Sequence, residues 1–558
     1  MQISFKEWTR KGNPWIWLNA AAVSVSLIAV LGLMLLIMAR GLVHFWPHSL
    51  IQADYVLEGK EPVPVIGEVA QREDIPTEQL KAAGYPVKAD EDFMTRILLK
   101  TGNRDVLGSD FRWVLEGSLK NVRYPETLIT LERREWGNYY GYQVAYKNNG
   151  TVVANAQESG DKTWELLIAG IARADALNAQ IEEIEKGEIG KVNYELERLR
   201  LTEKRLQLEG KATDSALAEL EAERQLLHKD YERLQAQLGE LYTEIGRDTV
   251  VMRAMNGQET EISVSKIVRA FQPNKMGLIE KIGHYGMKLG EFVGDDPREA
   301  NTEGGVFPAI YGTVLMVLIM SIMVTPLGVI AAVYLREYAN QGALTQTIRI
   351  AVNNLAGVPA IVYGVFGLGF FVYFLGGNID RLFYPEALPS PTFGTGGLMW
   401  ASITLAILTL PVVIVATEEG LARIPRSIRE GSLALGATKA ETLWRVVLPM
   451  ASPAMMTGMI LAIARAAGEV APLMLVGVVK LAPSLPLDGN YPFLHLDQKF
   501  MHLGFHIYDV GFQSPNVEAA RPLVYATSLL LVLVIALLNL AAVGIRNHLR
   551  EKYKALEM

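Results

Sequence analysis

Six long stretches without charged residues constrain the fold of this chain more than any other feature of its sequence. They cover residues 16–39, 306–335, 350–379, 398–417, 446–479 and 522–545, and only the stretch 446–479 is interrupted, by Arg465 and Glu469. A helix needs about 20 apolar residues to cross the roughly 30 Å hydrocarbon core of a bilayer. The sequence therefore predicts six transmembrane helices and excludes a purely water-soluble enzyme.

The first stretch could also be a signal peptide, because Lys6, Arg10 and Lys11 precede it. Its uncharged part is longer than the roughly 7–15 residues of a signal-peptide core, and no clear small-residue cleavage site follows it. We therefore expect a retained membrane anchor.

The segment 47–305 has a different composition from the rest of the chain. It holds 33 basic and 45 acidic residues, which gives it a net charge of -12. Such a charge density is typical of a water-soluble domain, and its acidity argues against nucleic acid as a partner. The chain has 0 cysteines, which excludes disulfides, thiolate metal sites and cysteine nucleophiles. No catalytic residue, metal site or cofactor is indicated.

The distribution of Lys and Arg predicts the orientation in the membrane, because short cytoplasmic loops are enriched in these residues. With the N-terminus inside, the inner segments 1–15, 336–349, 419–445 and 546–558 hold 14 of them, and the outer loops 380–397 and 480–521 hold 4. We expect both termini in the cytoplasm and residues 47–305 outside it.

The outer segment is predicted to combine strands with a long helical hairpin. β-rich runs within 97–157 and 250–268 indicate strands, with hairpin turns at Asn149-Gly150 and Asn256-Gly257. Between them, apolar residues spaced three and four apart predict a coiled-coil hairpin at about 175–246, turning at 210–214 and roughly 50 Å long. This rod either packs only on its own domain or acts as a lever or docking arm for an extracytoplasmic partner.

The cytoplasmic loop 419–449 is predicted to form two short helices. Pro425 suits a first turn and Gly436 a helix end, while Thr438 and Glu441 form a capping box for the second helix. The expected product is a basic, amphipathic helix-turn-helix at the inner membrane face, which lies on lipid or docks on a protein.

The same loop resembles a known motif. Glu430-Gly431-Ser432, Gly436 and Val446-Val447-Leu448-Pro449 are similar to the EAA loop of bacterial ABC importer permeases, E-A-A-x3-G-x9-I-x-L-P. Gly431 and Ser432 replace the two alanines, and Val446 replaces the isoleucine. The segments 305–339, 353–364 and 461–473 resemble phosphate-importer permeases of the PstA type. The resemblance covers about 305–545 and does not cover 47–305.

The resemblance implies an all-α polytopic protein with six transmembrane helices, the MetI-like permease fold and a large extracytoplasmic β-plus-coiled-coil insertion. Its parts would be 1–46 (N-terminus and first helix), 47–305 (insertion), 306–545 (permease domain) and 546–558 (basic tail). The implied partners in a bacterial inner membrane are a second permease (PstC type), an ATPase dimer (PstB type) and an extracytoplasmic phosphate-binding protein. No G-x4-G-K-[ST] motif is present, so ATP hydrolysis would belong to a partner. Glu430 is then the best candidate for the ATPase contact, and an ordinary solvated charge is the alternative.

Arg465 and Glu469 are charges inside the fifth predicted helix, one turn apart on the same face. A charge at the centre of a membrane helix costs about 2.5–3.5 kcal/mol on insertion scales, so both should face protein or a water-filled path. They either form an internal ion pair that locks helices, or Arg465 binds a passing phosphate oxyanion while Glu469 positions it. We favour the second interpretation. Asn353, Asn354, Gly357 and Pro359 further suggest that the third helix begins with a break.

The leading hypothesis is therefore a permease subunit of an ATP-driven phosphate importer. Two alternatives stay open: a permease for another oxyanion, such as sulfate or molybdate, and a membrane-anchored scaffold or signalling subunit. A scaffold has no need of a charge such as Arg465 in the membrane, which argues against the last alternative.

Overall fold

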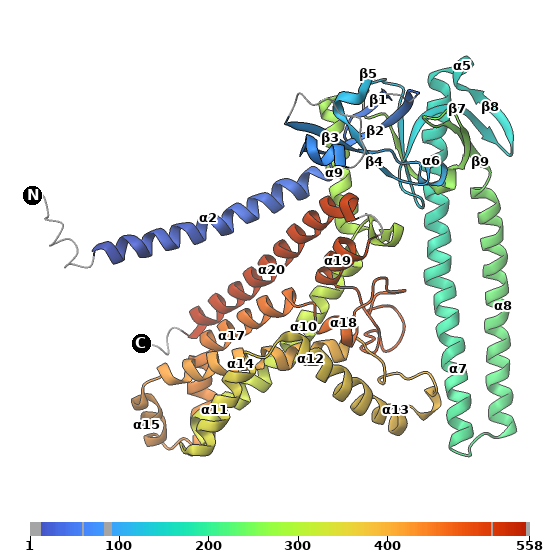
Figure 1. Cartoon of the computed structure of the whole chain (residues 1–558). Coiled ribbons are helices and arrows are strands. Elements are labelled where there is room, and N and C mark those ends of the chain that lie inside the picture. Colours follow the sequence, from blue (N-terminus) through green and yellow to red (C-terminus); the bar gives the residue numbers. More distant parts are fainter. Residues whose placement is uncertain (1–12, 58–60, 83–91, 515–516, 554–558) are drawn as a thin grey trace, which may run out of the picture.

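The computed structural model describes residues 13–57, 61–82, 92–514 and 517–553. Lys6, Arg10 and Lys11, and the end of the basic tail at 554–558, lie outside the described residues. A β-rich unit sits at one end of the molecule, a helical hairpin extends from it, and a bundle of apolar helices lies beside the hairpin (Figure 1). The first long helix, α2 (Asn13–Val43), diverges from the bundle (Figure 1).

Among the described residues, six helical segments are long and apolar enough to cross a membrane, and each coincides with a predicted span. They are Trp15–Val43, Phe307–Tyr338, Ala360–Phe383, Leu398–Arg423, Lys439–Gly468 and Ala520–His548. The corresponding elements are α2, α10 (Phe307–Val333) with η5 (Tyr334–Tyr338), α12 (Ala360–Phe366) with η6 (Gly367–Gly376) and α13 (Gly377–Phe383), α14 (Leu398–Arg423), α16 (Lys439–Thr442) with η8 (Leu443–Val447) and α17 (Leu448–Gly468), and α20 (Val517–Tyr553).

Two predicted spans have different bounds in the structure. Residues 350–355 belong to the separate helix α11 (Ala343–Leu355), and Pro359 starts α12, which confirms the expected break. The fifth span does not continue to residue 479, because α17 ends at Gly468 and the short helix α18 (Leu473–Val476) follows. Glu469 has extended backbone angles, and Pro472 cannot donate the hydrogen bond that a continuous helix requires. Arg465 therefore lies in the last turn of α17 and not in the middle of a helix.

The bundle is built around α14, which lies between α10 and α17. Small residues allow these helices to approach closely: a Cβ on Gly328 of α10 would lie 2.6 Å from Val413, and one on Gly420 of α14 would lie 2.4 Å from Ala454. In contrast, none of the apolar window of α2 is buried against the rest of the described chain, and α2 meets α20 near its end at Gly41. The apolar surface of α2 is thus free to contact lipid or another subunit.

The β-rich unit contains two antiparallel sheets. The first has the order β4-β3-β2-β1-β5, and the second has the order β10-β9-β7-β6-β11 with β8 paired to β7. The strands are β1 (Leu50–Tyr55), β2 (Val63–Pro76), β3 (Phe93–Lys100), β4 (Phe111–Leu115), β5 (Leu119–Arg123), β6 (Ile129–Arg133), β7 (Tyr139–Asn148), β8 (Thr151–Asn155), β9 (Asp248–Arg253), β10 (Glu259–Ser263) and β11 (Ile267–Phe271). Asn149 and Gly150 both have positive φ angles at the predicted β7–β8 turn.

Minor elements complete this unit and its connection to the bundle. They are the helices α3 (Thr77–Ala82), α4 (Arg104–Leu107), α5 (Ala156–Ser159) and α9 (Leu278–Gly294), and the two-residue strands β12 (Pro297–Arg298) and β13 (Glu303–Gly304). The connection between the last two spans contains α19 (Leu503–Tyr508) and η9 (Asp509–Gln513).

The helical hairpin has a longer first arm than its sequence predicts. This arm consists of α6 (Asp161–Glu182), the π-helical segment η2 (Glu183–Ile189) and α7 (Gly190–Leu208), so it starts at residue 161 instead of about 175. The second arm is α8 (Asp214–Ile245), and the turn lies where it was expected. Leu167 and Ile171 of α6 share a core with Ile129 and Met252 of the second sheet, which explains the earlier start.

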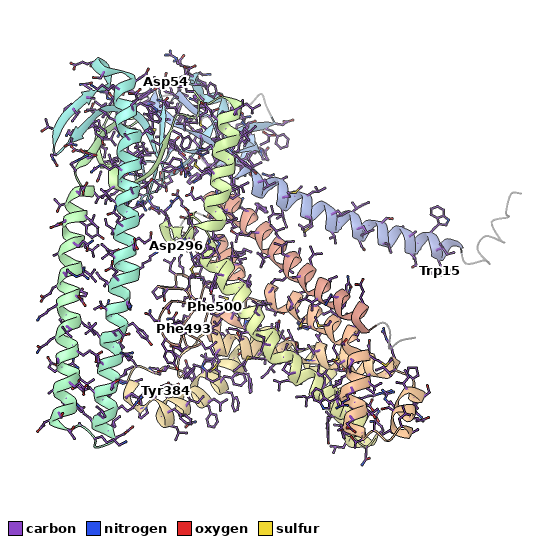
Figure 2. All side chains as sticks on the ribbon, turned by 180° about the vertical axis from the view of Figure 1, so that it is seen from behind. Trp15, Asp54, Asp296, Tyr384, Phe493 and Phe500 are labelled. Carbon is purple, nitrogen blue, oxygen red and sulfur yellow. The ribbon has the colours of Figure 1, made fainter. Side chains whose placement is uncertain are left out.

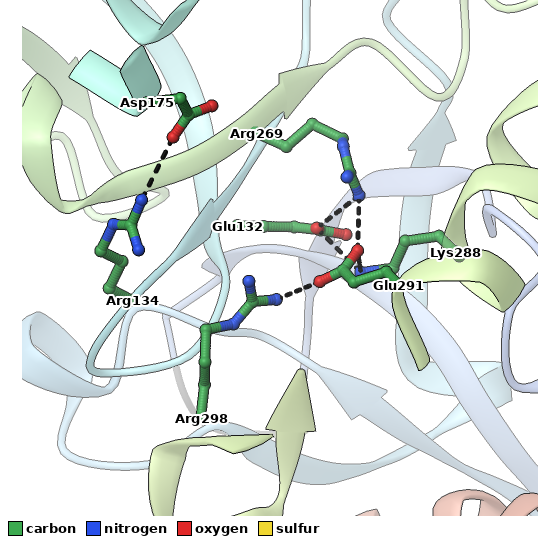
Figure 3. Close-up of polar contacts among 7 residues, drawn as sticks. All are labelled: Glu132, Arg134, Asp175, Arg269, Lys288, Glu291 and Arg298. Carbon is green, nitrogen blue, oxygen red and sulfur yellow. Dashed lines mark hydrogen bonds and ion pairs between the residues drawn. The ribbon is translucent and has the colours of Figure 1, made fainter. Parts of the chain in front are cut away.

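A charged cluster joins the β-rich unit to α9 (Figure 3). Glu132 of β6 accepts from Arg269 of β11 at 3.1 Å and from Lys288 of α9 at 2.9 Å, and Glu291 accepts from the same two cations and from Arg298. Burial acts to raise the pKa of Glu291, but the nearby charges of Lys288, Arg298 and Arg269 outweigh it and lower this pKa to about 2. The cluster therefore fixes α9 on the second sheet.

Candidate functional site

The structure forms the predicted two-helix loop. α15 (Arg426–Ala434) begins after Pro425, and Gly436 then turns the chain with a φ of 89°. Thr438 and Glu441 form the capping box at the start of α16. The second helix does not stop in the loop but continues through η8 into α17, so the loop is rigidly joined to a membrane span.

Arg429 anchors α15 to the bundle. Its guanidinium donates to the carbonyl oxygens of Ile424 at 2.7 Å and Leu421 at 2.8 Å, and it pairs with Glu337 of η5 at 2.9 Å. Ser432 lies 2.9 Å from the hydroxyl of Thr442, which joins the two short helices. α15 is therefore linked to α14 and to α16, which continues into α17.

The remaining predicted loop residues are placed as follows. Glu430 and Gly431 are exposed on α15, and Glu430 forms no hydrogen bond or ion pair with another residue that the structure describes. Val446, Leu448 and Pro449 are half-buried where η8 passes into α17.

Sequence reasoning missed two apolar residues on the same surface. Leu435 and Trp444 are 91% and 74% exposed, in the same loop as the exposed Glu430 and Arg426. Exposed large apolar residues ringed by charge are typical of a protein contact. Their signal in the sequence was weak, because an apolar residue in a membrane-proximal loop looks like part of the adjoining span.

Arg465 and Glu469 lie together at the break that follows α17. Arg465 Nε is 3.7 Å from Glu469 Oε1, and the side chains are 32% and 25% exposed. At this distance the two groups form an ion pair without a hydrogen bond. Neither terminal nitrogen of Arg465 forms a hydrogen bond with a residue that the structure describes, so both keep their capacity to donate.

The break itself is held inside the bundle. A Cβ on Gly364 of α12 would lie 2.7 Å from Pro472, and the amide of Gly397, just before α14, donates to Val476 at 2.9 Å. Non-helical backbone in a membrane region is tolerated where protein buries it or where it lines a water-filled cavity. Arg465 and the loop 419–449 lie at opposite ends of α17, so one helix joins them and they do not form one site.

Two loops of the bundle contact the helical hairpin. Seen from behind, the hairpin runs beside the bundle from the level of Asp296 to that of Tyr384 (Figure 2). At its far end, Arg205 of α7 pairs with the buried carboxylate of Glu386, and Lys204 donates to the carbonyl of Leu388. Tyr194 donates to the carbonyl of Tyr491, and Lys186 pairs with Asp296 at 2.8 Å. The rod thus packs on the bundle as well as on its own domain.

Comparison with known proteins agrees with these features. Residues 324–555 match the family model described as "Binding-protein-dependent transport system inner membrane component". The chain is 36% identical to "Phosphate transport system permease protein PstA 1" of Mycobacterium tuberculosis over 247 residues, which is 44% of this chain and 71% of that protein. The chain belongs to this permease family. This confirms the expected relationship to permeases of the PstA type and the expected permease fold with an N-terminal β-rich insertion.

Other relatives are consistent with this assignment. The chain is 30% identical to "Probable ABC transporter permease protein YqgI" of Bacillus subtilis, over 45% of this chain and 81% of that protein. It also resembles part of the solved "MetNI methionine ABC transporter", with 19% identity, coverage of 44% of this chain and 94% of that chain, and a TM-score of 0.30. The assignment rests on the family model and the sequence relatives alone. This PstA-type protein is a multi-pass permease subunit of an ABC importer in the inner membrane.

Proposed function

We propose that this permease forms part of the path for inorganic phosphate in an ATP-driven importer, with ATP hydrolysis by a separate subunit. The observation that carries the proposal is the guanidinium of Arg465, with both terminal nitrogens able to donate, at a helix break in the bundle, in a chain whose relatives are named phosphate permeases. A guanidinium binds phosphate oxygens through two parallel hydrogen bonds.

Glu469 has a positioning role in this proposal. It holds Arg465 through a 3.7 Å contact that leaves the terminal nitrogens free, and its negative charge weakens the retention of an anion. A transport site must bind its substrate and also release it. The break between α17 and α18 interrupts a membrane span, as do the breaks in the discontinuous helices that line substrate sites in other transporters.

The loop 419–449 is proposed to dock on the ATPase. Glu430, Leu435 and Trp444 form its exposed surface, and Arg429 and Ser432 hold the loop to α14 and α17. Closure of an ATPase dimer would move this surface and would tilt α17, whose far end carries Arg465. Transport would then follow ATP hydrolysis through one rigid helix.

The assembly is proposed to contain a PstC-type second permease, a PstB-type ATPase dimer and an extracytoplasmic phosphate-binding protein. The chain is 33% identical over 197 residues to a PstC permease of Xylella fastidiosa, which supports a pair of related permeases. The exposed apolar surface of α2 supports contact with lipid or with such a subunit. The charge distribution supports cytoplasmic termini and a periplasmic 47–305 unit.

The Arg465→Ala variant tests the path. Loss of charge-assisted hydrogen bonds worth about 1.5–3 kcal/mol should reduce phosphate uptake about tenfold or more. The measurement is uptake of radiolabelled phosphate by cells, together with copurification of the partner subunits. Arg521→Ala is the matched control, because Arg521 is exposed on α20.

Unchanged uptake in the Arg465→Ala variant with an intact complex would refute the role of Arg465. If the unaltered complex carried radiolabelled sulfate or molybdate and not phosphate, the oxyanion assignment would be wrong while the permease assignment would stand.

A further inference from the structure

Helix α9 carries an uncharged face that no part of the described chain covers. Ile279 is 86% exposed and Ile282 is 55% exposed, and the other members of this α9 face are Leu278, Gly283, Gly286, Met287, Gly290, Val293 and Gly294. Added Cβ atoms on these four glycines would meet no neighbour within 4 Å. The opposite side of α9 holds His284, Lys288 and Glu291, which contact the second sheet.

Beside the α9 face, Tyr285 of α9 meets the end of the first membrane span. Phe45 and Trp46, which follow α2, contact the ring of Tyr285 with centroid distances of 6.4 and 6.0 Å. α9 lies across this end of α2 and does not run parallel to it (Figure 1). An open hollow of about 320 Å³ between them is lined by Leu42, Val43, Trp46 and Tyr285. The apolar surface of α9 is therefore continuous with the apolar surface of α2.

The backbone also ties α9 to the next span. The amide of Val306, directly before α10, donates to the carbonyl of Phe292 at 2.8 Å. α9 thus lies at the level where both α2 and α10 reach the β-rich unit, which is where the hydrocarbon of a bilayer would end. Aromatic residues such as Trp46 and Tyr285 are enriched at this depth.

We propose that α9 lies in the membrane interface, with the α9 face in contact with the lipid leaflet nearest to the β-rich unit. A helix with one apolar face and one charged face, placed at the ends of transmembrane helices, has the properties of an interfacial helix. The α9 face carries no charge that lipid contact would have to desolvate. The glycines of the α9 face have no side chains, so acyl chains and glycerol groups can approach the helix backbone closely.

The charged cluster gives this contact a consequence for the β-rich unit. Lys288 of α9 pairs with Glu132 of the second sheet, and Glu291 of α9 pairs with Arg269 of the same sheet, so a membrane-bound α9 holds the sheet at a set height and tilt above the bilayer. The lipid surface is then a structural partner of the insertion. This inference is independent of the transported substrate.

Site-directed spin labelling tests the proposal directly, because the chain has 0 native cysteines. Ile279→Cys, Ile282→Cys and, as a matched apolar control, Leu226→Cys on α8, whose native side chain is 63% exposed, are each labelled. The full chain, with the subunits that copurify with it, is reconstituted into vesicles of phosphatidylethanolamine and phosphatidylglycerol. The collision rates of each label with oxygen, which enters lipid, and with a water-soluble nickel chelate are then measured.

We expect the labels at 279 and 282 to collide mainly with oxygen and the label at 226 to collide mainly with the nickel chelate. Labels at 279 and 282 that matched the control at 226 would show a water-exposed face and overturn the proposal. Labels shielded from both reagents would show that a protein subunit covers α9, which would also overturn it. The use of two sites on α9 keeps the test decisive if one variant does not assemble.

Discussion

At the scale of single residues, Glu291 makes three of the ion pairs in the charged cluster that joins α9 to the β-rich unit and to β12. Its two oxygens accept from Lys288, Arg269 and Arg298, which come from three different elements. Without this carboxylate, Arg269 and Lys288 would share Glu132 in a partly buried site, and Arg298 would lose its ion pair. Removal of one partner from a buried ion pair costs more than the pair itself contributes, because the remaining charges stay desolvated.

We predict that Glu291→Gln destabilises the protein by on the order of 3 kcal/mol at neutral pH. Because the pKa of Glu291 is lowered from its ordinary value of 4.5 to about 2, the stabilisation that the Glu291 carboxylate provides is complete above pH 4.5. It is lost as the pH falls toward about 2. Thermal unfolding across this pH range should therefore show a steeper acid loss in the unaltered protein than in the variant. Glu135→Gln, which removes only an exposed pair with Lys266, is the control. Equal acid sensitivity of the unaltered protein and the Glu291→Gln variant would contradict the prediction.

Gly436 presents a different case, because its role is conformational. Its φ of 89° disfavours any residue with a Cβ, and the surrounding space is open, so a replacement introduces backbone strain and no clash. We predict that Gly436→Val distorts the α15–α16 turn at a cost of about 1–2 kcal/mol and uncouples ATP hydrolysis from uptake. Both rates are measured on the reconstituted complex. Gly431→Ala, in a helix and in open space, should leave both rates unchanged.

At the scale of elements, the contact between the rod and the α13–α14 loop is the most specific feature of the insertion. Glu386 is only 2% exposed, and Arg205 is its cation. We predict that Arg205→Ala leaves Glu386 buried without a partner and increases hydrogen exchange in residues 385–397, with a partial loss of uptake. Arg200→Ala, which removes only a local pair with Glu197, is the matched control.

The double variant Arg205→Ala/Glu386→Gln separates charge from packing. If the pair acts through charge, the second substitution should restore part of the exchange protection. Exchange that is the same in the single variant and the control would show that the rod does not hold this loop.

Elements with a strong local pattern could be predicted from the sequence. The long uncharged runs located all six candidate spans, and the Thr438–Glu441 capping box located α16, because both signals lie within a single continuous segment. α9 was missed, since its four glycines read as helix breakers although Leu278, Ile282, Leu289 and Val293 follow helical spacing. β1 and β2 were missed as well, because their residues are held by pairing with distant strands more than by their own pattern.

The candidate site was predictable only in part, for the same reason. The residues Arg465 and Glu469 were found from their charge in an apolar run, and their contact is the one that their spacing predicts. The end of α17 at Gly468 was not predicted, because the apolar run continues past Pro472 without a change in composition. The pairing of Arg205 with Glu386 spans 181 residues, and no local signal links the two.

At the scale of the whole molecule, the orientation in the membrane is a prediction that the cysteine-free chain makes simple to test. We expect Lys211→Cys, at the tip of the rod, to react in intact cells with a maleimide that reaches the periplasm but does not cross the inner membrane. Ala437→Cys, in the loop 419–449, should react only after the inner membrane is permeabilised. Lys211 is exposed, and Ala437 is half-buried between the exposed Gly436 and Thr438, so neither site is buried and membrane access decides the result. The reverse pattern would invert the topology and refute the periplasmic position of 47–305.

The contact between Arg205 and Glu386 also has a consequence for the order in which the protein is made. A ribosome completes the rod long before it reaches the loop that holds Glu386, 181 residues later. Early segments of a chain fold during synthesis, so the finished rod is available as a surface when the second half is inserted. The insertion would then act as an internal template in biogenesis, receiving the α13–α14 loop as the two flanking helices enter the bilayer.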